Sequence, residues 1–285
     1  MTLPLLKIER FLAHAHSSDQ GATWRAMSAL PVKFDNAEEY PSTYELLASS
    51  LNSARPAAAV LDLACGDGQL LNILASRAPT STELFGVDMS PEELVHARGL
   101  LGPRATLQLG RAQALPFAAQ TFDLVLSHMA LMLFEQEHLV VAEIERVLRP
   151  GGRLSAVVGV APPKSQVQAV FSELLSQYER LPEWRDIRFR SRLFSSPSSI
   201  AELLVGFTDF ISKSCLIAQD GTPLQAWAWF GGMYELHALT IDQRASLRDE
   251  FLRRCGSIAL DGRVTWKVKV LYFSATRVQP AHADL

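Results

Sequence analysis

Short apolar runs alternate with amphipathic stretches over residues 57–160 of this chain. The apolar runs have the length of buried strands, and the stretches between them repeat apolar residues at helical spacing. Predicted strands occupy residues 57–63, 83–87, 105–109, 122–127 and 154–160, and predicted helices occupy residues 70–76, 91–101 and 136–148. This alternation predicts a doubly wound α/β fold, in which helices cover both faces of a parallel sheet.

The pattern changes after residue 160. Pro162-Pro163 opens a segment with a predicted helix over residues 166–180, and we interpret residues 161–195 as a first cap insertion. Ser196-Pro197 then begins a core helix that Gly206 ends. The remaining predicted elements are a strand over residues 207–212, a second cap insertion over residues 215–254 that includes a helix with the capping box Thr240 and Gln243, and a long last strand over residues 264–278.

Residues 1–50 precede the first predicted strand. Two groups of breakers, residues 17–21 and Pro41-Ser42, separate helical patterns in this region. We therefore predict an amino-terminal helical lid over residues 1–50 and a core domain with the two cap insertions over residues 51–285.

The first predicted strand leads into a glycine-containing turn and then into a helix. Gly66 and Gly68 occupy this turn; glycine lets a ligand approach the backbone closely and adopts backbone angles that other residues avoid. A dinucleotide-binding turn would need a third glycine at position 71, which is leucine. The turn thus predicts a nucleotide-like ligand but weakens the interpretation as a phosphate site.

The second predicted strand ends in Asp88, about 20 residues after the turn, where a carboxylate can accept hydrogen bonds from both ribose hydroxyls. Ser90 and Glu93 follow as a predicted capping box with Pro91 at the first helical position. Two strand–turn–helix units side by side predict a nucleoside site far more specifically than one glycine turn does.

These motifs resemble those of the class I S-adenosylmethionine-dependent methyltransferases, and the resemblance continues to residue 277. Residues 62–68 (Asp-Leu-Ala-Cys-Gly-Asp-Gly) are similar to the first motif of that family, and residues 87–90 to the second. Residues 115–117 with 121–125, and residues 147–154, resemble later segments that lead into core strands. The resemblance implies a seven-stranded, mostly parallel sheet whose last strand is antiparallel, and S-adenosyl-L-methionine as the cofactor.

The resemblance also implies the residues that hold this cofactor. Asp62 would face its ammonium group directly or through water, Asp88 its ribose and Met89 its adenine, while Cys65 packs in the turn. A carboxylate at position 62 would neutralise a buried cation, or would merely bind the loop backbone. The implied cofactor-binding set is Asp62, Ala64, Cys65, Gly66, Gly68, Asp88, Met89, Arg111, Ala112, Gln113 and Ser127.

Arg111 departs from the resembled pattern, which usually has an aspartate that accepts from the adenine amino group. Arginine has no acceptor lone pair. Either Gln113 supplies the acceptor, or the backbone of Arg111 and Ala112 holds adenine while the Arg111 side chain stacks on the ring or faces solvent.

His128 follows the fourth predicted strand, at the edge where the reacting end of the substrate should lie. A neutral imidazole there can remove a proton from an attacking hydroxyl or amine, or it can shape the pocket by hydrogen bonding to a carbonyl. Methyl transfer can also proceed mainly by positioning, which needs no base. His14, His16 and His237 lie in the predicted caps and are weaker candidates, while His96 falls on the second predicted helix, where we expect it to face solvent.

The sequence after the fourth strand also argues against nucleobase or glutamine methylation. Residues 127–130 (Ser-His-Met-Ala) lack the Asn/Asp-Pro-Pro-Tyr/Phe tetrad that holds a planar amine or amide in the families that methylate those groups. The predicted caps instead carry bulky apolar side chains that can enclose an apolar or aromatic small molecule or simply form helix core. These are Trp24, Met27, Phe34, Tyr40, Tyr44, Trp227, Trp229, Phe230, Met233 and Tyr234.

Composition limits the possible partners. A formal net charge of −3 over 285 residues provides no general attraction to nucleic acid or a membrane. The cysteines, Cys65, Cys215 and Cys255, have no metal-ligand spacing and suggest free thiols in a reducing compartment. We therefore expect a cytoplasmic enzyme, monomeric or homodimeric, with no bound metal.

The sequence thus predicts a methyltransferase that acts on a small, partly apolar or aromatic metabolite at oxygen, nitrogen or carbon. One alternative is a methyltransferase whose substrate is carrier-bound or macromolecular, which would need an open cleft. The other is a cofactor-binding regulator without transferase activity, which the arginine at position 111 favours.

Overall fold

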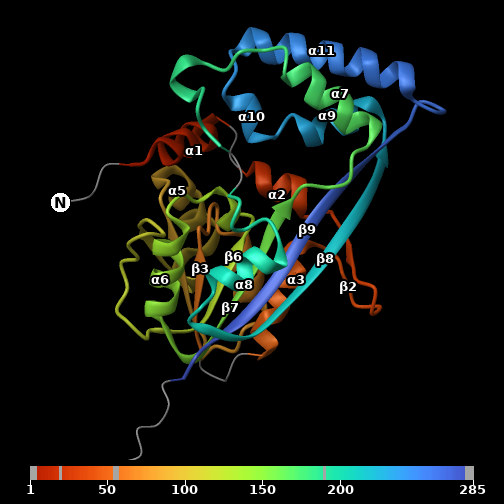
Figure 1. The fold of residues 1–285 in the computed structure, drawn as a ribbon. Helices are drawn as coiled ribbons and strands as arrows, with labels where there is room; N and C mark the ends of the chain where they lie inside the picture. Colours follow the sequence, from red (N-terminus) through yellow and green to blue (C-terminus); the bar gives the residue numbers. More distant parts are fainter. Residues whose placement is uncertain (1–4, 19–20, 54–57, 189–190, 280–285) are drawn as a thin grey trace, which may run out of the picture.

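A seven-stranded sheet forms the centre of the molecule, which is described by a computed structural model over residues 5–18, 21–53, 58–188 and 191–279 (Figure 1). The strand order is β5-β4-β3-β6-β7-β9-β8. Strand β9 runs antiparallel to both of its neighbours, and the other strands are parallel to one another. The strands are β3 (Ala59–Leu63), β4 (Glu83–Asp88), β5 (Thr106–Leu109), β6 (Phe122–His128), β7 (Leu148–Val160), β8 (Phe207–Gly221) and β9 (Val264–Arg277). This topology confirms the predicted fold class, including the antiparallel last strand.

Helices cover both faces of this sheet, because side chains of the central strands alternate between two hydrophobic cores. In β3, Val60 packs into one core and Leu61 into the other, and both are fully buried. Helices α3, α4 and α5 contribute to the first core, and α6 and α8 to the second. These helices are α3 (Thr43–Ala48), α4 (Gln69–Arg77), α5 (Pro91–Leu101), α6 (Glu137–Val147) and α8 (Pro197–Leu203).

Strand β8 is much longer than predicted. The pattern predicts a strand over residues 207–212, but β8 continues to Gly221 and pairs with β9 along this length. Cys215 and Ile217 alternate with exposed residues and are buried against the cap. The second insertion was therefore predicted to begin too early at residue 215, because a long two-stranded arm carries the cap before any helix begins.

Strand β7 also begins earlier than predicted, at Leu148 instead of residue 154. Leu148 pairs with Phe122, and the register shifts before the next paired residue of β6, Leu124. Gly151 has a φ of 75° in this segment, which lets the strand bend at Pro150-Gly151-Gly152 without ending.

The caps lie above the carboxyl-terminal edge of the sheet (Figure 1). The β8–β9 arm reaches up to the carboxyl-terminal cap, while the amino-terminal segment contributes α1 and α2 to the caps and forms a hairpin of β1 and β2 beside β8. This hairpin was missed because each of its strands has only two residues. The hairpin strands are β1 (Val32–Lys33) and β2 (Glu39–Tyr40), and the cap helices are α1 (Lys7–Ser18), α2 (Ala22–Met27), α7 (Gln166–Leu175), α9 (Pro223–Phe230), α10 (Tyr234–His237) and α11 (Ile241–Ile258).

Candidate functional site

The turn between β3 and α4 has the strained backbone that its glycines allow. Ala64, Gly66 and Gly68 all have positive φ angles, of 59°, 52° and 85°. A Cβ atom on Gly68 would come within 3.0 Å of the Ala97 side chain. Gly68 therefore lets α4 pack closely against α5, whereas Gly66 lines the large cavity described below.

Asp88 at the end of β4 braces this turn. Its Oδ2 accepts a hydrogen bond from the Gly66 backbone N–H and its Oδ1 from the Ser90 N–H, both at 2.9 Å. Burial raises the pKa of Asp88, and the hydrogen bonds from Ser90 and Gly66 oppose this rise. Since each carboxylate oxygen can accept a further hydrogen bond, Asp88 retains acceptor capacity toward the cavity.

Asp62 presents a buried carboxyl group at the end of β3. The residue is only 1% exposed, and its Oδ2 has no hydrogen-bond partner among the described residues. Burial raises the pKa of Asp62 well above its ordinary value of 3.8, and the charges of Asp88 and Asp67 raise it further. An unpaired buried carboxyl group is costly unless a donor or cation binds it.

Glu93 adds a third acidic side chain to this wall. The Ser90 hydroxyl accepts from the Glu93 N–H at 3.2 Å and so begins α5, as predicted. The reciprocal half of the predicted capping box is absent, because the Ser90 N–H donates to Asp88. The Glu93 Oε2 is buried without a partner in the described structure, and burial raises the pKa of this carboxyl to about 7.

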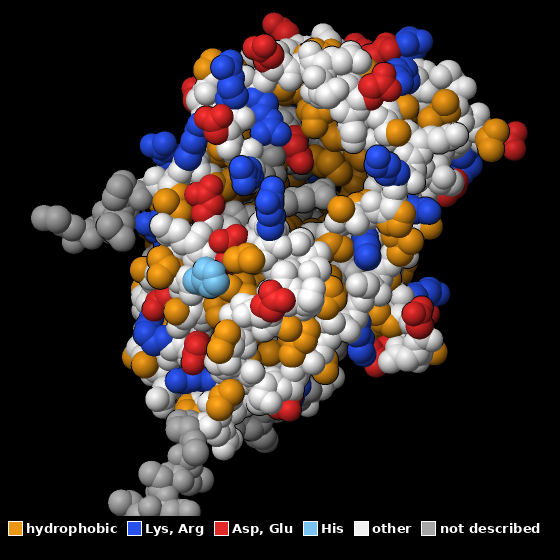
Figure 2. Space-filling model, in the orientation of Figure 1, with side chains coloured by type: hydrophobic (Ala, Val, Ile, Leu, Met, Phe, Trp, Pro, Cys, Tyr) orange, Lys and Arg blue, Asp and Glu red, His pale blue; other side chains and the backbone are white. Residues whose placement is uncertain are grey.

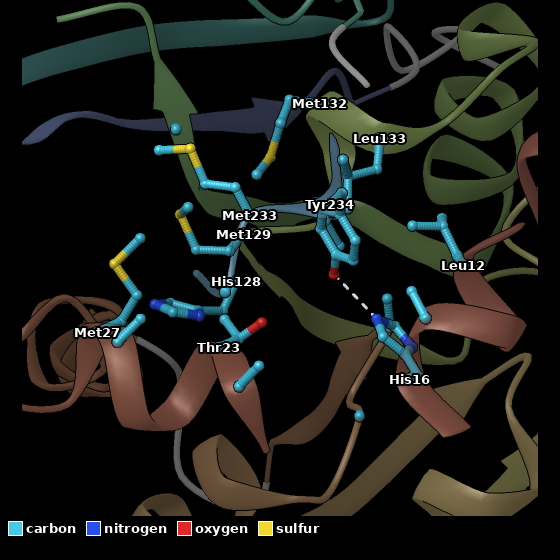
Figure 3. Close-up of a pocket in the computed structure, with 18 of the residues that line it drawn as sticks. Leu12, His16, Thr23, Met27, His128, Met129, Met132, Leu133, Met233 and Tyr234 are labelled. Carbon is cyan, nitrogen blue, oxygen red and sulfur yellow. Dashed lines mark hydrogen bonds between the residues drawn. The ribbon is translucent and has the colours of Figure 1, made fainter. Parts of the chain in front are cut away.

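These acidic residues line one end of a cavity of about 1090 Å³ between the sheet edge and the caps. Figure 2 shows the hollow from outside, with hydrophobic side chains inside it and Lys and Arg side chains near its opening. Figure 3 shows part of its interior, where Met27, His128 and Met129 lie on one side of the view and His16 and Leu12 on the other. A volume of this size accommodates a cofactor together with a second small molecule.

Most of the predicted cofactor-binding residues line this one cavity. They are Asp62, Ala64, Cys65, Gly66, Asp88, Met89, Arg111, Ala112 and Gln113. Two predicted residues lie outside the lining. Gly68 sits at the α4–α5 contact, and the fully buried Ser127 hydroxyl donates to the Leu63 carbonyl at 3.1 Å.

Arg111 forms an ion pair with the amino-terminal segment. Its Nε lies 2.9 Å from Glu9 Oε1 and its terminal nitrogen 2.8 Å from Glu9 Oε2, a bidentate contact between partly buried side chains. The Gln113 amide nitrogen donates to the Glu135 carbonyl at 3.1 Å. The Arg111 side chain thus connects the β5 loop to α1, a role that the sequence alone does not indicate.

His128 lies deep in the cavity wall. Its Nε2 is 2.9 Å from the Thr43 hydroxyl, and its ring stacks on Tyr44 with centroids 3.8 Å apart. Burial lowers the pKa of His128 to about 3. The imidazole is therefore neutral at physiological pH, but it is a weak base.

His16 on α1 lies in the same cavity, and its Nε2 is 2.9 Å from the hydroxyl of Tyr234 on α10 (Figure 3). Burial lowers the pKa of His16, while the nearby Asp88 charge opposes the shift. The sequence ranked His16 below His128, and it gave Glu9 no role in the site. The signal in the sequence that could have pointed to Glu9 is that it is an acidic residue in the first turn of α1.

The bulky cap residues divide into two groups. Trp24, Met27, Tyr44, Trp227, Trp229, Phe230, Met233 and Tyr234 line the cavity. Phe34 and Tyr40 instead pack against each other beside the hairpin, with ring centroids 6.4 Å apart. The predicted enclosure therefore contains most of the cap aromatics but not those of β1–β2.

The residues of the acidic end are chemically suited to S-adenosylmethionine. The unpaired Asp62 carboxyl and the Glu93 carboxyl can neutralise its ammonium and sulfonium charges, and Asp88 can accept from its ribose. At Gly66, the nearest heavy atom to an added Cβ would be 4.0 Å away, so the turn leaves open space beside the backbone. Within the described ranges, no helix is long and apolar enough to cross a membrane.

Comparisons with known proteins agree with this chemistry. Residues 60–152 match the family described as a methyltransferase domain. The chain is 28% identical over 249 residues to nocamycin O-methyltransferase of Saccharothrix syringae, covering 80% of this chain and 88% of that protein. It is 32% identical over 135 residues to demethylmenaquinone methyltransferase of Symbiobacterium thermophilum, covering 46% of this chain and 54% of that protein.

The match thus spans nearly all of the first relative but only about half of the second. Among solved structures, the YcgJ protein of Bacillus subtilis shares the fold, with a TM-score of 0.56 and 19% identity. That match covers 83% of this chain and 98% of the other.

Proposed function

Because this chain is a class I S-adenosylmethionine-dependent methyltransferase, we propose that it methylates a small, partly apolar metabolite enclosed between its two caps. The observation that carries the proposal is a single cavity with an acidic end at the β3 and β4 turns and an apolar remainder. The cofactor supplies an electrophilic methyl group on a sulfonium. The protein contributes mainly position, which can account for several orders of magnitude in rate.

The acidic end binds the cofactor in this proposal. Asp62 binds its ammonium group and Asp88 its ribose hydroxyls, while Met89 and the Ala112 backbone border the adenine. Since Arg111 is paired with Glu9, the adenine amino group is bound by backbone or by Gln113 after this amide leaves the Glu135 carbonyl.

Helices α1 and α2 act as the lid in this proposal, whereas α3 of the same segment packs against the sheet. The Glu9–Arg111 and His16–Tyr234 contacts hold α1 against the core and against the carboxyl-terminal cap. A substrate enclosed between α2 and α9–α10 must enter before these contacts form. Closure would also exclude water from the sulfonium.

His128 faces the acceptor in this proposal. As a neutral imidazole held by Thr43 and Tyr44, it can orient an acceptor hydroxyl or amine and take its proton after attack begins. Its low pKa favours orientation over proton abstraction from a weakly acidic acceptor.

A metabolite screen tests the proposed activity. Methyl transfer from labelled S-adenosylmethionine would be measured for free small molecules that include carboxylic acids. The same carboxylic acids would also be tested while attached to an acyl carrier. Transfer to free molecules supports the proposal, whereas transfer to carrier-bound acids alone would favour the carrier-bound alternative. Cofactor binding without any transfer would favour a regulator.

The variant Asp88→Ala tests the cofactor site. Loss of charge-assisted hydrogen bonds to the ribose should weaken cofactor binding at least about tenfold in calorimetry. The Gly66 turn also loses its brace, so the melting temperature should fall as well. Unchanged cofactor affinity in folded Asp88→Ala protein would contradict the assignment.

A further inference from the structure

The lysines of this chain differ in their surroundings. The chain contains six lysines, and the three that do not line the cavity, Lys7, Lys33 and Lys213, form ion pairs with carboxylates. The other three, Lys164, Lys267 and Lys269, line the cavity. Among the described residues, no ion pair or hydrogen bond joins the ammonium groups of these three to another side chain.

Two of these lysines are held close together on β9. Lys267 and Lys269 lie two positions apart, on the strand face opposite to Trp266 and Val268, and both are partly buried. Their cross-strand neighbours are apolar: Ala218 opposite Lys267, and Leu216 and Val160 opposite Lys269. Two ammonium groups on one strand face repel each other, and an anionic group bound between them would form charge-assisted hydrogen bonds with both.

The lysines are far from the acidic end of the cavity. Strands β6 and β7 separate β3 from β9, so three strand spacings, about 14 Å, lie between the Asp62 strand and the lysine strand. The cavity therefore has a negative end for the cationic cofactor and a positive end beyond the apolar middle. The two cavity arginines do not share this feature, because Arg111 is paired with Glu9 and Arg25 also has a partner.

We propose that Lys267 and Lys269, assisted by Lys164, form an anchor for an anionic group, a carboxylate or a phosphate, at the far end of an elongated and mostly apolar methyl acceptor. This inference rests on the proposed function. The anchor holds the end of the acceptor remote from the reacting atom, and the apolar middle of the cavity holds its body. The lysines thus select acidic acceptors over neutral ones of the same shape.

Binding of matched probes tests this anchor. Phenylbutanoate, phenyloctanoate and phenylbutyl phosphate would be titrated by calorimetry, each against the corresponding primary amide or alcohol, into protein saturated with S-adenosylhomocysteine. At least one acid should bind about tenfold more tightly than its neutral counterpart, and the preference should weaken at high ionic strength. The acid with the larger preference identifies the group as carboxylate or phosphate.

The double variant Lys267→Met/Lys269→Met should lose this preference while it binds the neutral probes and the cofactor as the wild type does. The matched control is Lys33→Met/Lys213→Met, which removes the same two charges from lysines outside the cavity and should keep the preference. Equal binding of acids and neutral probes to the wild type, or a preference that survives in the folded double variant, would overturn the anchor. Failure of the wild type to bind S-adenosylhomocysteine would instead overturn the proposed function.

Discussion

Replacement of Asp62 by asparagine should have opposite effects on stability and on cofactor binding. The Asp62 carboxyl is almost fully buried, and one of its oxygens has no partner among the described residues. Asparagine keeps a polar group at this position but removes the negative charge, which burial and the neighbouring Asp88 and Asp67 disfavour, and we expect a gain of about 1–3 kcal/mol where Asp62 would be ionised. For a domain of this size, each kcal/mol raises the melting temperature by roughly 2–4 °C.

The gain in stability of Asp62→Asn over the wild type should depend on pH. Because burial raises the pKa of folded Asp62 above its unfolded value, the folded state binds more protons between these two values. The wild-type free energy of unfolding therefore falls as pH rises from about 3.8 to the raised pKa. Asp62→Asn has no carboxyl group that titrates at this position, so its free energy of unfolding should not fall in this way. The difference in stability between the variant and the wild type should therefore be largest on the alkaline side of that pH window.

The same substitution should weaken cofactor binding roughly tenfold to a hundredfold, because the charge-assisted contact that we propose between Asp62 and the ammonium group is lost. The assays are thermal unfolding without cofactor across pH and calorimetric titration with S-adenosylmethionine. Asp67→Asn is the matched control: it removes the same charge from the same turn, but its carboxylate already accepts from Gln69 at 3.2 Å. A lower melting temperature or an unchanged cofactor affinity in Asp62→Asn would refute the reasoning.

Three further predictions concern Glu93, His128 and the lid. Since the cofactor is cationic and the Glu93 pKa is about 7, cofactor affinity should rise up to about tenfold between roughly pH 6 and pH 8, and calorimetry on Glu93→Gln should show no such rise. His128→Ala should lower turnover by less than about tenfold if the imidazole only orients the acceptor, as its low pKa favours, and by roughly 10²–10⁴ if it takes the acceptor proton, with cofactor affinity nearly constant in both cases. Because the His128 pKa is about 3, the shape of the turnover profile between roughly pH 5 and pH 9 should not change in this variant, and loss of a limb there would contradict that pKa. Hydrogen exchange in described residues within 10–45 should slow when cofactor binds, and equal exchange with and without cofactor would argue against a lid.

Features that depend on neighbouring residues were predictable from the sequence. The Thr240–Gln243 capping box forms in full, with hydrogen bonds of 2.9 and 3.2 Å. Helix α5 begins at Pro91 after the Ser90 cap, as predicted. The parallel strands were also visible, because continuous apolar runs mark strands buried on both faces.

Competition for hydrogen bonds was not visible in the sequence. Ser90 and Glu93 have the spacing of a capping box, but Asp88 takes the Ser90 N–H and leaves the Glu93 carboxylate free to face the cavity. Which acceptor wins depends on the angle at which β4 ends, and the residue pattern does not encode that angle. The length of β8 was missed for a related reason, since its pairing partner β9 lies more than forty residues away along the chain.

The sequence by itself determined the sheet, the glycine turn and the place of Asp88, because each follows from periodicity or from contacts within a few residues. Only the tertiary structure decided how the caps complete the site. Glu9 meets Arg111 across 102 positions, and His16 meets Tyr234 across 218. The tertiary structure also decided that Lys267 and Lys269 line the cavity. A lysine on a strand gives the same alternation of polar and apolar residues in the sequence whether it faces a carboxylate or an apolar cavity. Charge and burial become specific only when the packing of distant elements fixes which groups share one volume.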